Sequence, residues 1–413
     1  MLESYDVVVI GGGPAGMGAA IKAKELGLKV LLLDDNDFLG GILPQCIHPG
    51  FGLHYFKEEL TGPEFAYRLI NKLDGVEVKT SARVIEIQNY SDLEKFVTYV
   101  SPEGVKKVAT KTIIYAAGAR ERHAFEIGIV GDRVAGIYTA GEAQALMDLY
   151  GILPGRDIVI VGSGDVGLIM ARRFALEGCN VKAVIELMPY PGGLARNLMI
   201  LKDFNIPLYL SHKVVEVRGR KRVEKVKVVK VDENLREIPG SEFWIEADTL
   251  IISAGLIPNV KLLQEIGVRI DPATGGPVVN DRLETSVPGI FVAGNSLLIN
   301  DLVDYVVEQG ETAAEGAKEF IENGGIKSTR WIKLVKGENV RLVAPHYLSG
   351  ERDVWIYARV QRPIEDVTLE FPEIGKKLRL PVVKPSEMLR IKLRGEEIRK
   401  AKEKITMQVV KNE

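Results

Sequence analysis

The segment 38–56, FLGGILPQCIHPGFGLHYF, brings together residue types that could do chemistry. Cys46 offers a thiol, and His48 offers an imidazole whose ordinary pKa suits proton transfer near neutral pH. Disulfide exchange needs two thiols within reach of each other, and the only other cysteine is Cys179, in the stretch LEGCNV. The sequence therefore disfavours disulfide exchange. It leaves Cys46 as either a buried side chain or a single redox or adduct-forming thiol.

The histidines and the second cysteine also have structural explanations. His48 could give or take a proton, or it could be hydrogen-bonded within its own loop. His54 begins a stretch typical of a helix, HYFKEELTGPEFAYRLINKL, and we expect a structural role for it. Cys179 stands where a helix should end and is typical of a small packed hydrophobic residue. The catalytic candidates are therefore Cys46 and His48, and we expect no metal site, because two cysteines are too few for a structural zinc or an iron–sulfur cluster.

Two segments of the chain share one pattern and could position such groups. Residues 7–34 and 158–186 each show a β-branched run, a glycine turn, a helical stretch and a second apolar run that ends in an acid. In each glycine turn, the first glycine permits a tight turn, the second leaves room for a pyrophosphate, and the third lets helix and strand pack closely. The helix N-terminus offers unpaired N–H groups to the phosphates, and the closing acid accepts from ribose hydroxyls.

This duplicated pattern predicts two bound dinucleotides in one chain, an arrangement typical of a flavin fed by a nicotinamide. The residues that we predict to bind the first dinucleotide are Gly11, Gly13, Pro14, Ala15, Gly16 and Asp34. The residues that we predict to bind the second are Gly162, Gly164, Asp165, Val166, Gly167 and Glu186. Glu186 favours the free 2′-hydroxyl of NAD(H) over the 2′-phosphate of NADP(H), since the nearest arginine, Arg196, stands ten residues further on.

Length and composition are those of a multidomain globular protein. The chain has 413 residues, which is too long for a single hydrophobic core. Hydrophobic residues make up 46% and charged residues 27%, as in an ordinary globular protein. A net charge of −2 gives no general attraction to nucleic acid or to an anionic membrane. Glycine or charge interrupts every apolar run before it reaches membrane-spanning length, and no export signal precedes the first strand. We therefore expect a cytoplasmic protein with no membrane span and no nucleic-acid partner.

With these fingerprints, the sequence resembles the two-dinucleotide-domain flavoproteins of the pyridine nucleotide–disulfide oxidoreductase superfamily over residues 1–325. The stretches TIIYAAGARER, TLIISAGLIPN and TSVPGIFVAGNSL look like that family's domain exits and its late FAD motif. The resemblance implies that the first fold binds FAD and that the inserted second fold binds NAD(H). It adds to the predicted FAD site Gly40, Gly41, Val84, Gly118, Gly294, Asn295, Asp304 and Tyr305, and to the NAD site Gly255.

Asn295 departs from the family's motif, and Asp304 allows two interpretations. Asn295 stands where the family's late motif usually has aspartate, and its amide can still bond a ribityl hydroxyl. Asp304 lies at the start of the helical stretch 301–321, whose N-terminus in relatives points at the flavin, where the helix dipole favours negative charge. The alternative for Asp304 is a solvated acid in a first helical turn.

The expected architecture is α/β, with two Rossmann-like three-layer dinucleotide-binding domains, the second inserted in the first, and a small β-rich C-terminal domain. We expect the FAD-binding domain over 1–125 and 256–325, the NAD(H)-binding domain over 126–255, and the C-terminal domain over 326–413. The C-terminal domain should hold alternating strands with proline-marked turns, followed by a charged helix over 386–405. Its role would be to cap the main body or to dock a partner.

The segments 40–66 and 117–144 look like a narrower group within this superfamily. They are similar to the flavoprotein found beside anaerobic glycerol-3-phosphate dehydrogenase and to flavoprotein subunits of sarcosine oxidase, dye-linked proline dehydrogenase and hydrogen cyanide synthase. The resemblance implies an FAD-dependent NADH oxidoreductase that exchanges electrons with a partner dehydrogenase or electron-transfer subunit carrying flavin or iron–sulfur, within a hetero-oligomer. The alternatives are a stand-alone NADH oxidase or small-acceptor reductase, and a nucleotide-binding structural subunit without turnover.

Overall fold

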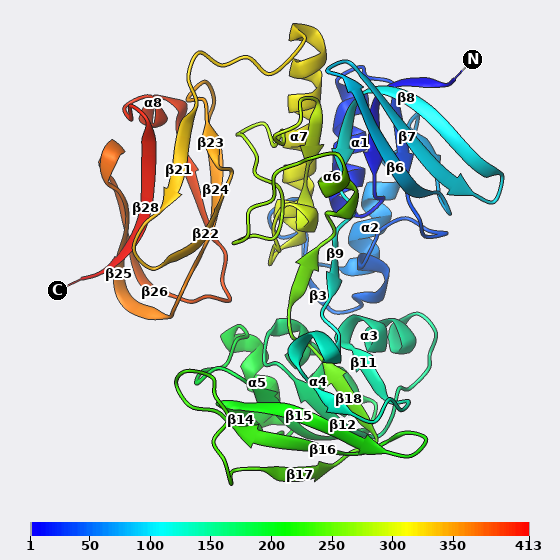
Figure 1. The fold of residues 1–413 in the computed structure, drawn as a ribbon, viewed down its shortest axis with the longest axis vertical. Coiled ribbons are helices and arrows are strands. Elements are labelled where there is room, and N and C mark those ends of the chain that lie inside the picture. The colour runs from blue at the N-terminus through cyan, green and yellow to red at the C-terminus, as the bar shows by residue number, and fades with distance from the viewer. Residues whose placement is uncertain (1, 413) are drawn as a thin grey trace. The chain divides into compact units, whose positions relative to one another are not determined.

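Two parallel sheets with one shared strand pattern organise the chain (Figure 1). The computed structural model describes residues 2–412, which divide into two compact units. Unit 1 runs to Ala119 and resumes at Pro258, and unit 2 is Arg120–Ile257. The chain passes between them through β9 (Ala119–Glu121) and β19 (Leu256–Pro258), which pair with each other. The expected α/β fold with duplicated dinucleotide-binding domains and a β-rich C-terminal region is confirmed.

The main sheet of unit 1 has the strand order β5-β2-β1-β8-β20, and all of these pairs are parallel. Its strands are β1 (Ser4–Ile10), β2 (Val30–Leu33), β5 (Glu77–Lys79), β8 (Gly104–Tyr115) and β20 (Ile290–Val292). The long β8 also joins an antiparallel meander with β6 (Arg83–Ser91) and β7 (Glu94–Ser101). The helices are α1 (Pro14–Glu25), α2 (Gly62–Ile70), α6 (Lys261–Glu265) and α7 (Val303–Asn323), and a short ribbon pairs β3 (Pro49–Phe51) with β4 (Leu60–Thr61).

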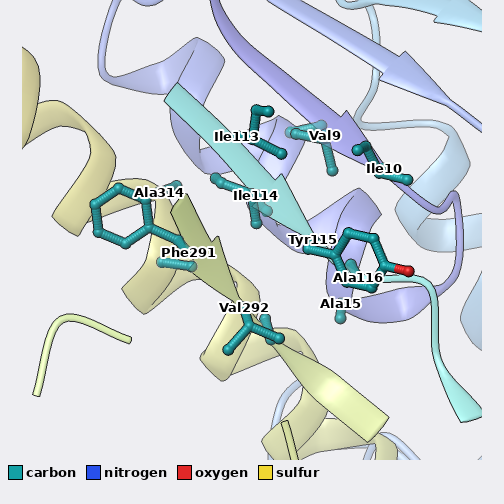
Figure 2. Packing of buried hydrophobic residues seen from close by; sticks show 14 of the residues in the cluster. Val9, Ile10, Ala15, Ile113, Ile114, Tyr115, Ala116, Phe291, Val292 and Ala314 are labelled. Carbon is teal, nitrogen blue, oxygen red and sulfur yellow. The ribbon is translucent and has the colours of Figure 1, made fainter. Parts of the chain in front are cut away.

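Continuous apolar runs form the strands at the centre of this sheet, because both of its faces are buried: Val8 and Val9, which point to opposite faces, are each 0% exposed. Figure 2 shows Val9 and Ile10 of β1 beside Ile113 and Ile114 of β8, with Phe291 of β20 on the next strand. All five side chains are buried. This core fixes the carboxyl ends of β1 and β8, from which the fingerprint turn and the exit turn leave the sheet.

Unit 2 repeats the arrangement with the strand order β14-β13-β12-β18-β11, again parallel throughout. Its strands are β11 (Ile137–Thr139), β12 (Asp157–Val161), β13 (Asn180–Glu186), β14 (Leu208–Leu210) and β18 (Thr249–Ile252). Its helices are α3 (Ala140–Asp148), α4 (Asp165–Leu176) and α5 (Ala195–Asp203). A second sheet holds β10 (Val130–Gly131), β15 (His212–Gly219), β16 (Val223–Lys230) and β17 (Phe243–Glu246).

The C-terminal region belongs to unit 1 but has a hydrophobic core of its own. One sheet has the order β23-β21-β28-β25-β26 and the other β22-β24-β27. The elements are β21 (Ile332–Lys336), β22 (Val340–Ala344), β23 (Tyr347–Leu348), β24 (Val354–Val360), β25 (Ile364–Phe371), β26 (Lys376–Val383), β27 (Leu389–Leu393), α8 (Gly395–Ile398) and β28 (Lys404–Lys411).

The charged helix expected over 386–405 is wrong. That stretch contains β27, the one-turn α8 and the start of β28. Leu389, Ile391 and Leu393 alternate with charged residues and pair with β24, so the apolar period is two and not 3.6. Arg390 and Lys392, which stand between these apolar residues, resemble the charged face of a helix in the sequence. In the structure they lie on the opposite face of β27 from the apolar residues.

The helix expected to begin at His54 is also wrong at its start. Residues 54–59 form turns, and α2 begins only at Gly62. Thr61 caps it by accepting from the backbone N–H of Glu64, whose carboxylate accepts in return from the backbone N–H of Thr61 at 2.8 Å. This capping box sets the helix start, and Pro63 fits its first turn.

Candidate functional site

The glycine turn after the first strand has the same geometry in both units. Gly11 and Gly162 have φ values of +105° and +97°, which favour glycine. A Cβ on Gly11 would lie 2.3 Å from the carbonyl oxygen of Ala116, and one on Gly162 would lie 2.1 Å from that of Ser253. The turn therefore passes directly against the exit of β8 in unit 1 and of β18 in unit 2, as predicted for a dinucleotide-binding fold.

The second and third glycines of each fingerprint differ in what surrounds them. A Cβ would lie 1.7 Å from a backbone oxygen at Gly16 and 2.4 Å at Gly167, so the close packing of helix and strand requires both. At Gly13 the nearest atom would be 3.8 Å away, and at Gly164 there is nothing within 4 Å. Their φ values, −73° and −66°, suit any residue. The protein itself therefore does not require glycine at Gly13 or Gly164, whereas a pyrophosphate passing against the backbone would.

The N-termini of α1 and α4 are open in the same way. Neither has a side-chain cap. In contrast, Thr61 and Thr139 cap α2 and α3, each with a glutamate in a capping box. The first N–H groups of α1 and α4 are thus left for another acceptor, and a phosphate is the acceptor that a helix N-terminus favours. These features fit a dinucleotide in each unit.

Asp34 closes β2 and is held against the first fingerprint turn. It is 5% exposed, and its carboxylate accepts from the backbone N–H of Gly12 and, at 2.8 Å, from that of Asn36. Burial raises the pKa of this carboxyl group, while the two backbone N–H groups act in the opposite direction. A carboxylate has about four lone-pair positions, so Asp34 retains capacity to accept from ribose hydroxyls.

Glu186 holds the equivalent place in unit 2. One of its oxygens accepts from Ser163 through the backbone N–H at 2.9 Å and the hydroxyl at 2.6 Å, and the other accepts from the N–H of Met188 at 2.8 Å. Asp165, in the first turn of α4, is turned to the following loop and accepts from the N–H of Leu194 at 2.8 Å. The two units therefore tie the closing acid to the fingerprint turn by the same kind of bond.

A second duplication, which the sequence reasoning missed, is a glycine pair that follows the acid. Gly40 and Gly41 come six and seven residues after Asp34, and 192–193 stand at the same spacing after Glu186. A Cβ on Gly41, the second glycine of its pair, would lie 3.0 Å from the Cα of Gly13. In unit 2 it is Gly192, the first glycine of its pair, whose Cβ would lie 3.6 Å from the Cα of Gly164. In both units one glycine of the pair lies close to the second fingerprint glycine. The spacing of the pair after the closing acid was the signal that could have revealed it.

The late motif after β20 is held by α7. The backbone N–H of Gly294 donates to the buried Gln309 side chain at 3.0 Å, and the other end of that amide donates to Asn300 at 2.9 Å. The Asn295 oxygen accepts from the backbone N–H of Asn300 at 3.0 Å. A network of neutral amides thus fixes this loop beside α7.

Asp304 joins α7 to the loop that carries the chemical groups. It is 2% exposed and accepts from the backbone N–H groups of His54 at 3.0 Å, Tyr55 at 2.7 Å and Gly52 at 3.4 Å. The alternative of a solvated acid is therefore wrong. Its neighbour Tyr305 is half-buried and lies 5.9 Å, ring centre to ring centre, from His54.

The two catalytic candidates lie on this same loop. Cys46 is half-buried, and its Sγ is 3.4 Å from the carbonyl oxygen of Ile42. The Nδ1 of His48 lies 3.0 Å from the carbonyl oxygen of Pro49, and its ring is 5.1 Å from that of Phe51. His48 is therefore hydrogen-bonded within its loop.

The remaining predicted residues lie after core strands, in first helical turns or, for Val84, in the meander strand β6. Gly118 follows β8 and Gly255 follows β18, with φ values of +65° and +90°. Val84 is half-buried in β6, where it pairs with Tyr99, and Val166 is 46% exposed in α4. Pro14 and the buried Ala15 open α1. The FAD set therefore lies in unit 1, and the NAD set lies in unit 2.

Two features of residues 2–412 bear on other functions. No group of three or more histidine, cysteine, aspartate or glutamate side chains is placed to hold a metal ion in this range. Within the same described residues, no helix has both the length and the apolar composition needed to cross a bilayer. The duplicated glycine turns thus remain the main candidate site.

Known proteins share this architecture. The chain is 26% identical over 397 residues to an NAD(P)H coenzyme A polysulfide/persulfide reductase from Pyrococcus horikoshii, covering 85% of this chain and 83% of that protein. It is 26% identical over 321 residues to hydrogen cyanide synthase subunit HcnB from Pseudomonas protegens, covering 71% of this chain and 66% of that protein. A solved thioredoxin reductase from T. acidophilum superposes with a TM-score of 0.65 at 26% identity, covering 78% of this chain and 99% of that one.

Residues 5–317 match the family model described as pyridine nucleotide-disulphide oxidoreductase. The match takes in both fingerprints, both closing acids and the late motif described above. The chain therefore belongs to the pyridine nucleotide-disulphide oxidoreductase family of FAD-dependent NAD(P)H oxidoreductases.

Proposed function

We propose that this chain is an FAD-dependent NADH oxidoreductase of the diaphorase type, which exchanges electrons with a partner dehydrogenase subunit. Glycerol-3-phosphate dehydrogenase is the partner type that its sequence resemblance favours. In this proposal unit 1 binds FAD and unit 2 binds NAD(H). A bound nicotinamide and a bound flavin supply hydride exchange, and the flavin can pass electrons on singly or in pairs.

The observation that carries the proposal is the open second glycine in both fingerprints. Gly13 and Gly164 are needed neither for backbone strain nor for packing within the protein, so each keeps room for a group from outside. An uncapped helix N-terminus and a buried closing acid lie beside each of them. Two such cradles in one chain support two dinucleotides, and this is what a nicotinamide-linked flavoenzyme needs.

The chain's own residues would bind and orient the two dinucleotides. The first N–H groups of α1 and α4 would bind the pyrophosphates. Asp34 and Glu186 would accept from the ribose hydroxyls, with their oxygens already fixed by backbone donors. Asn295 would bond a hydroxyl of the flavin's ribityl chain, and the uncapped N-terminus of α7 would favour negative charge near it.

A preference for NAD(H) follows from Glu186. Its carboxylate is 8% exposed and fixed by Ser163 and Met188, so it cannot swing away from a 2′-substituent. A 2′-phosphate would meet this negative charge at short range, whereas a free 2′-hydroxyl would donate to it.

Exchange of electrons with a partner subunit is supported by the relatives. HcnB is by its name a subunit of hydrogen cyanide synthase, and its similarity covers most of this chain. The C-terminal β-rich region, residues 326–412, would then contact both the flavin domain and a partner. This assignment gives the extra domain a role that nucleotide binding alone does not need.

Anaerobic titration with NADH tests the proposal. Purified protein should be yellow, and about one equivalent of NADH should bleach the flavin absorbance, after which a dye acceptor should restore it. Gly164→Ala is the matched control, because its Cβ would meet no protein atom within 4 Å. That variant should keep FAD and be bleached by dithionite but not by NADH. Persistent yellow colour in the wild type under excess NADH would contradict the proposal.

A second candidate is a stand-alone reductase of a small acceptor. It is favoured by the similarity to the coenzyme A polysulfide/persulfide reductase, which extends over 83% of that protein, and by the half-buried single thiol of Cys46. Steady-state turnover of NADH with polysulfide or oxygen as the only acceptor distinguishes the two. Rapid turnover that depends on Cys46 would favour this second candidate.

A further inference from the structure

Arg390, on β27 of the C-terminal region, packs against two aromatic rings, that of Tyr305 in the first turn of α7 and that of Trp355 on β24; we call this group the arginine clamp. Its guanidinium carbon lies 4.3 Å from the ring centre of Tyr305 and 3.8 Å from that of Trp355. It also forms an ion pair with Glu308. Its side chain is 14% exposed, and its Nε is the buried side-chain polar atom without a hydrogen-bond partner in the described part of the chain.

The residues around Arg390 come from the outer face of the three-stranded sheet. Tyr357 of β24 pairs with Arg390 in register, and Trp355 and Arg359 share its side of the strand. Arg359 binds Asp301 by an ion pair and donates to the carbonyl oxygen of Ile299 at 3.2 Å. This face therefore packs on the flavin domain and holds the segment that leads into α7, which lies beside the C-terminal strands in Figure 1.

The residues around Arg390 also contact residues that we predict to bind the flavin. Tyr357 lies 6.3 Å, ring centre to ring centre, from Tyr305. Gln309 follows Glu308, the ion-pair partner of Arg390, directly on α7. Gln309 in turn accepts from the backbone N–H of Gly294. Tyr305, one of the predicted flavin residues, is itself one face of the arginine clamp. The C-terminal region is thus joined to the flavin domain where we expect the isoalloxazine ring.

The charges of Arg390 and Glu308 are close enough to the N-terminus of α7 to change the electrostatic potential there. Glu308 stands five residues after Val303, the first residue of α7, which is about 7.5 Å along the axis. That distance is within the Debye length of about 8 Å at physiological salt. The opposite charges of Arg390 and Glu308 cancel while both are present, so removing either one would leave a net charge in a largely buried place.

We propose that the Arg390–Glu308 pair is a positioning and charge-setting pair for the flavin, through which the C-terminal region tunes the reduction potential of FAD bound in unit 1. This inference rests on the proposed function. Arg390 holds Tyr305 and the first turns of α7 in place, and Glu308 balances its charge. Neither residue needs to touch the flavin for this effect.

Measuring the two-electron midpoint potential of the full-length, FAD-loaded protein tests the inference. Arg390→Gln should lower the potential, because an unbalanced Glu308 disfavours electron uptake. Glu308→Gln should raise it, because Arg390 is then unbalanced. We expect shifts of roughly threefold to tenfold in the reduction equilibrium, which is about 15 to 30 mV for a two-electron couple. Potential shifts of opposite sign in the two variants would indicate an effect of charge. Loosening of the fold would instead shift the potentials of both variants in the same direction.

Arg379→Gln is the matched control, since it removes one positive charge from the exposed pair that Arg379 forms with Asp366 in the same C-terminal region. It should leave the potential unchanged. Shifts of the same sign in both clamp variants, or no shift in either while FAD stays bound, would overturn the inference alone. A wild-type chain that binds no FAD would overturn the proposed function and this inference together.

Discussion

The Asp304 carboxylate, in the first turn of α7, accepts a 2.7 Å hydrogen bond from the backbone N–H of Tyr55, 249 residues earlier in the chain. The N–H of His54 donates to the same oxygen at 3.0 Å. One buried acid thus holds the loop that carries Cys46 and His48 against the helix that we expect to face the flavin. The Tyr55 hydroxyl adds a second bond to the same helix by donating to Glu311 at 2.6 Å.

Replacing Asp304 should loosen this loop. Asp304→Ala would leave buried backbone N–H groups without an acceptor, and we expect a loss of about 2 to 4 kcal/mol of unfolding free energy, together with weaker FAD binding. Asp304→Asn keeps one acceptor oxygen and should cost less. Urea denaturation of the apoprotein and fluorescence titration with FAD measure the two effects. An alanine variant as stable as the wild type would contradict this role.

Replacing Cys46 by alanine should change little. Cys179, the other cysteine of the chain, is packed against the core of unit 2, where burial raises the pKa of its thiol, so we expect no disulfide step through Cys46. We expect flavin reduction by NADH and electron delivery to an acceptor to stay within about twofold, which is roughly 0.4 kcal/mol of activation free energy. Stopped-flow absorbance follows both steps, with Cys179→Ala as the control. Normal flavin reduction with lost delivery in Cys46→Ala alone would instead make Cys46 a redox thiol.

The nucleotide preference should depend on the charge of Glu186. We expect kcat/KM for NADH to exceed that for NADPH by roughly tenfold or more, which corresponds to about 1.4 kcal/mol. Glu186→Gln should narrow this ratio, chiefly by improving NADPH, since the repulsion of the 2′-phosphate is removed. Initial rates with both nucleotides provide the comparison. A faster rate with NADPH in the wild type would refute the assignment.

The stability of unit 1 should carry a pH signature from Glu284. Burial raises the pKa of this carboxyl group from 4.5 to about 6. The folded state therefore binds a proton more tightly than the unfolded state. The stabilisation from this group is complete below pH 4.5 and is lost as the pH rises through about 6. At about 1.4 kcal/mol per pH unit, the loss amounts to about 2 kcal/mol.

Urea denaturation of the wild type and Glu284→Gln between pH 4.5 and 7.5 isolates this contribution, because other groups cancel in the difference. As the pH falls from 7.5 to 4.5, the unfolding free energy of the wild type should increase by about 2 kcal/mol relative to that of the variant. A difference that does not vary with pH would show that Glu284 titrates normally.

The sequence was sufficient to predict the duplicated nucleotide-binding folds. Gly11 and Gly162, with the acids Asp34 and Glu186, mark local units whose spacing follows from a strand, a turn and a helix. Such units are specified by nearby residues, so reading them needs no knowledge of distant contacts. The fold class and the two sets of predicted site residues follow from this local pattern.

The contacts made across long sequence distances could not be predicted. Arg390 stands in a charged run that resembles an exposed helix, and only the packing of β24 and β27 on α7 shows that one face of that strand is covered. Asp304 resembled a solvated first-turn acid for the same reason, since its donors lie about 250 residues away. Burial of polar groups between domains leaves no periodic signal in the sequence.

The central claim is that one chain holds two separate dinucleotide sites. Equilibrium dialysis of the full-length protein against labelled FAD and labelled NAD⁺ together tests it most directly. We predict one FAD and one NAD⁺ bound per chain, with neither displacing the other. Competition between them for a single site, or failure of either to bind, would contradict the claim.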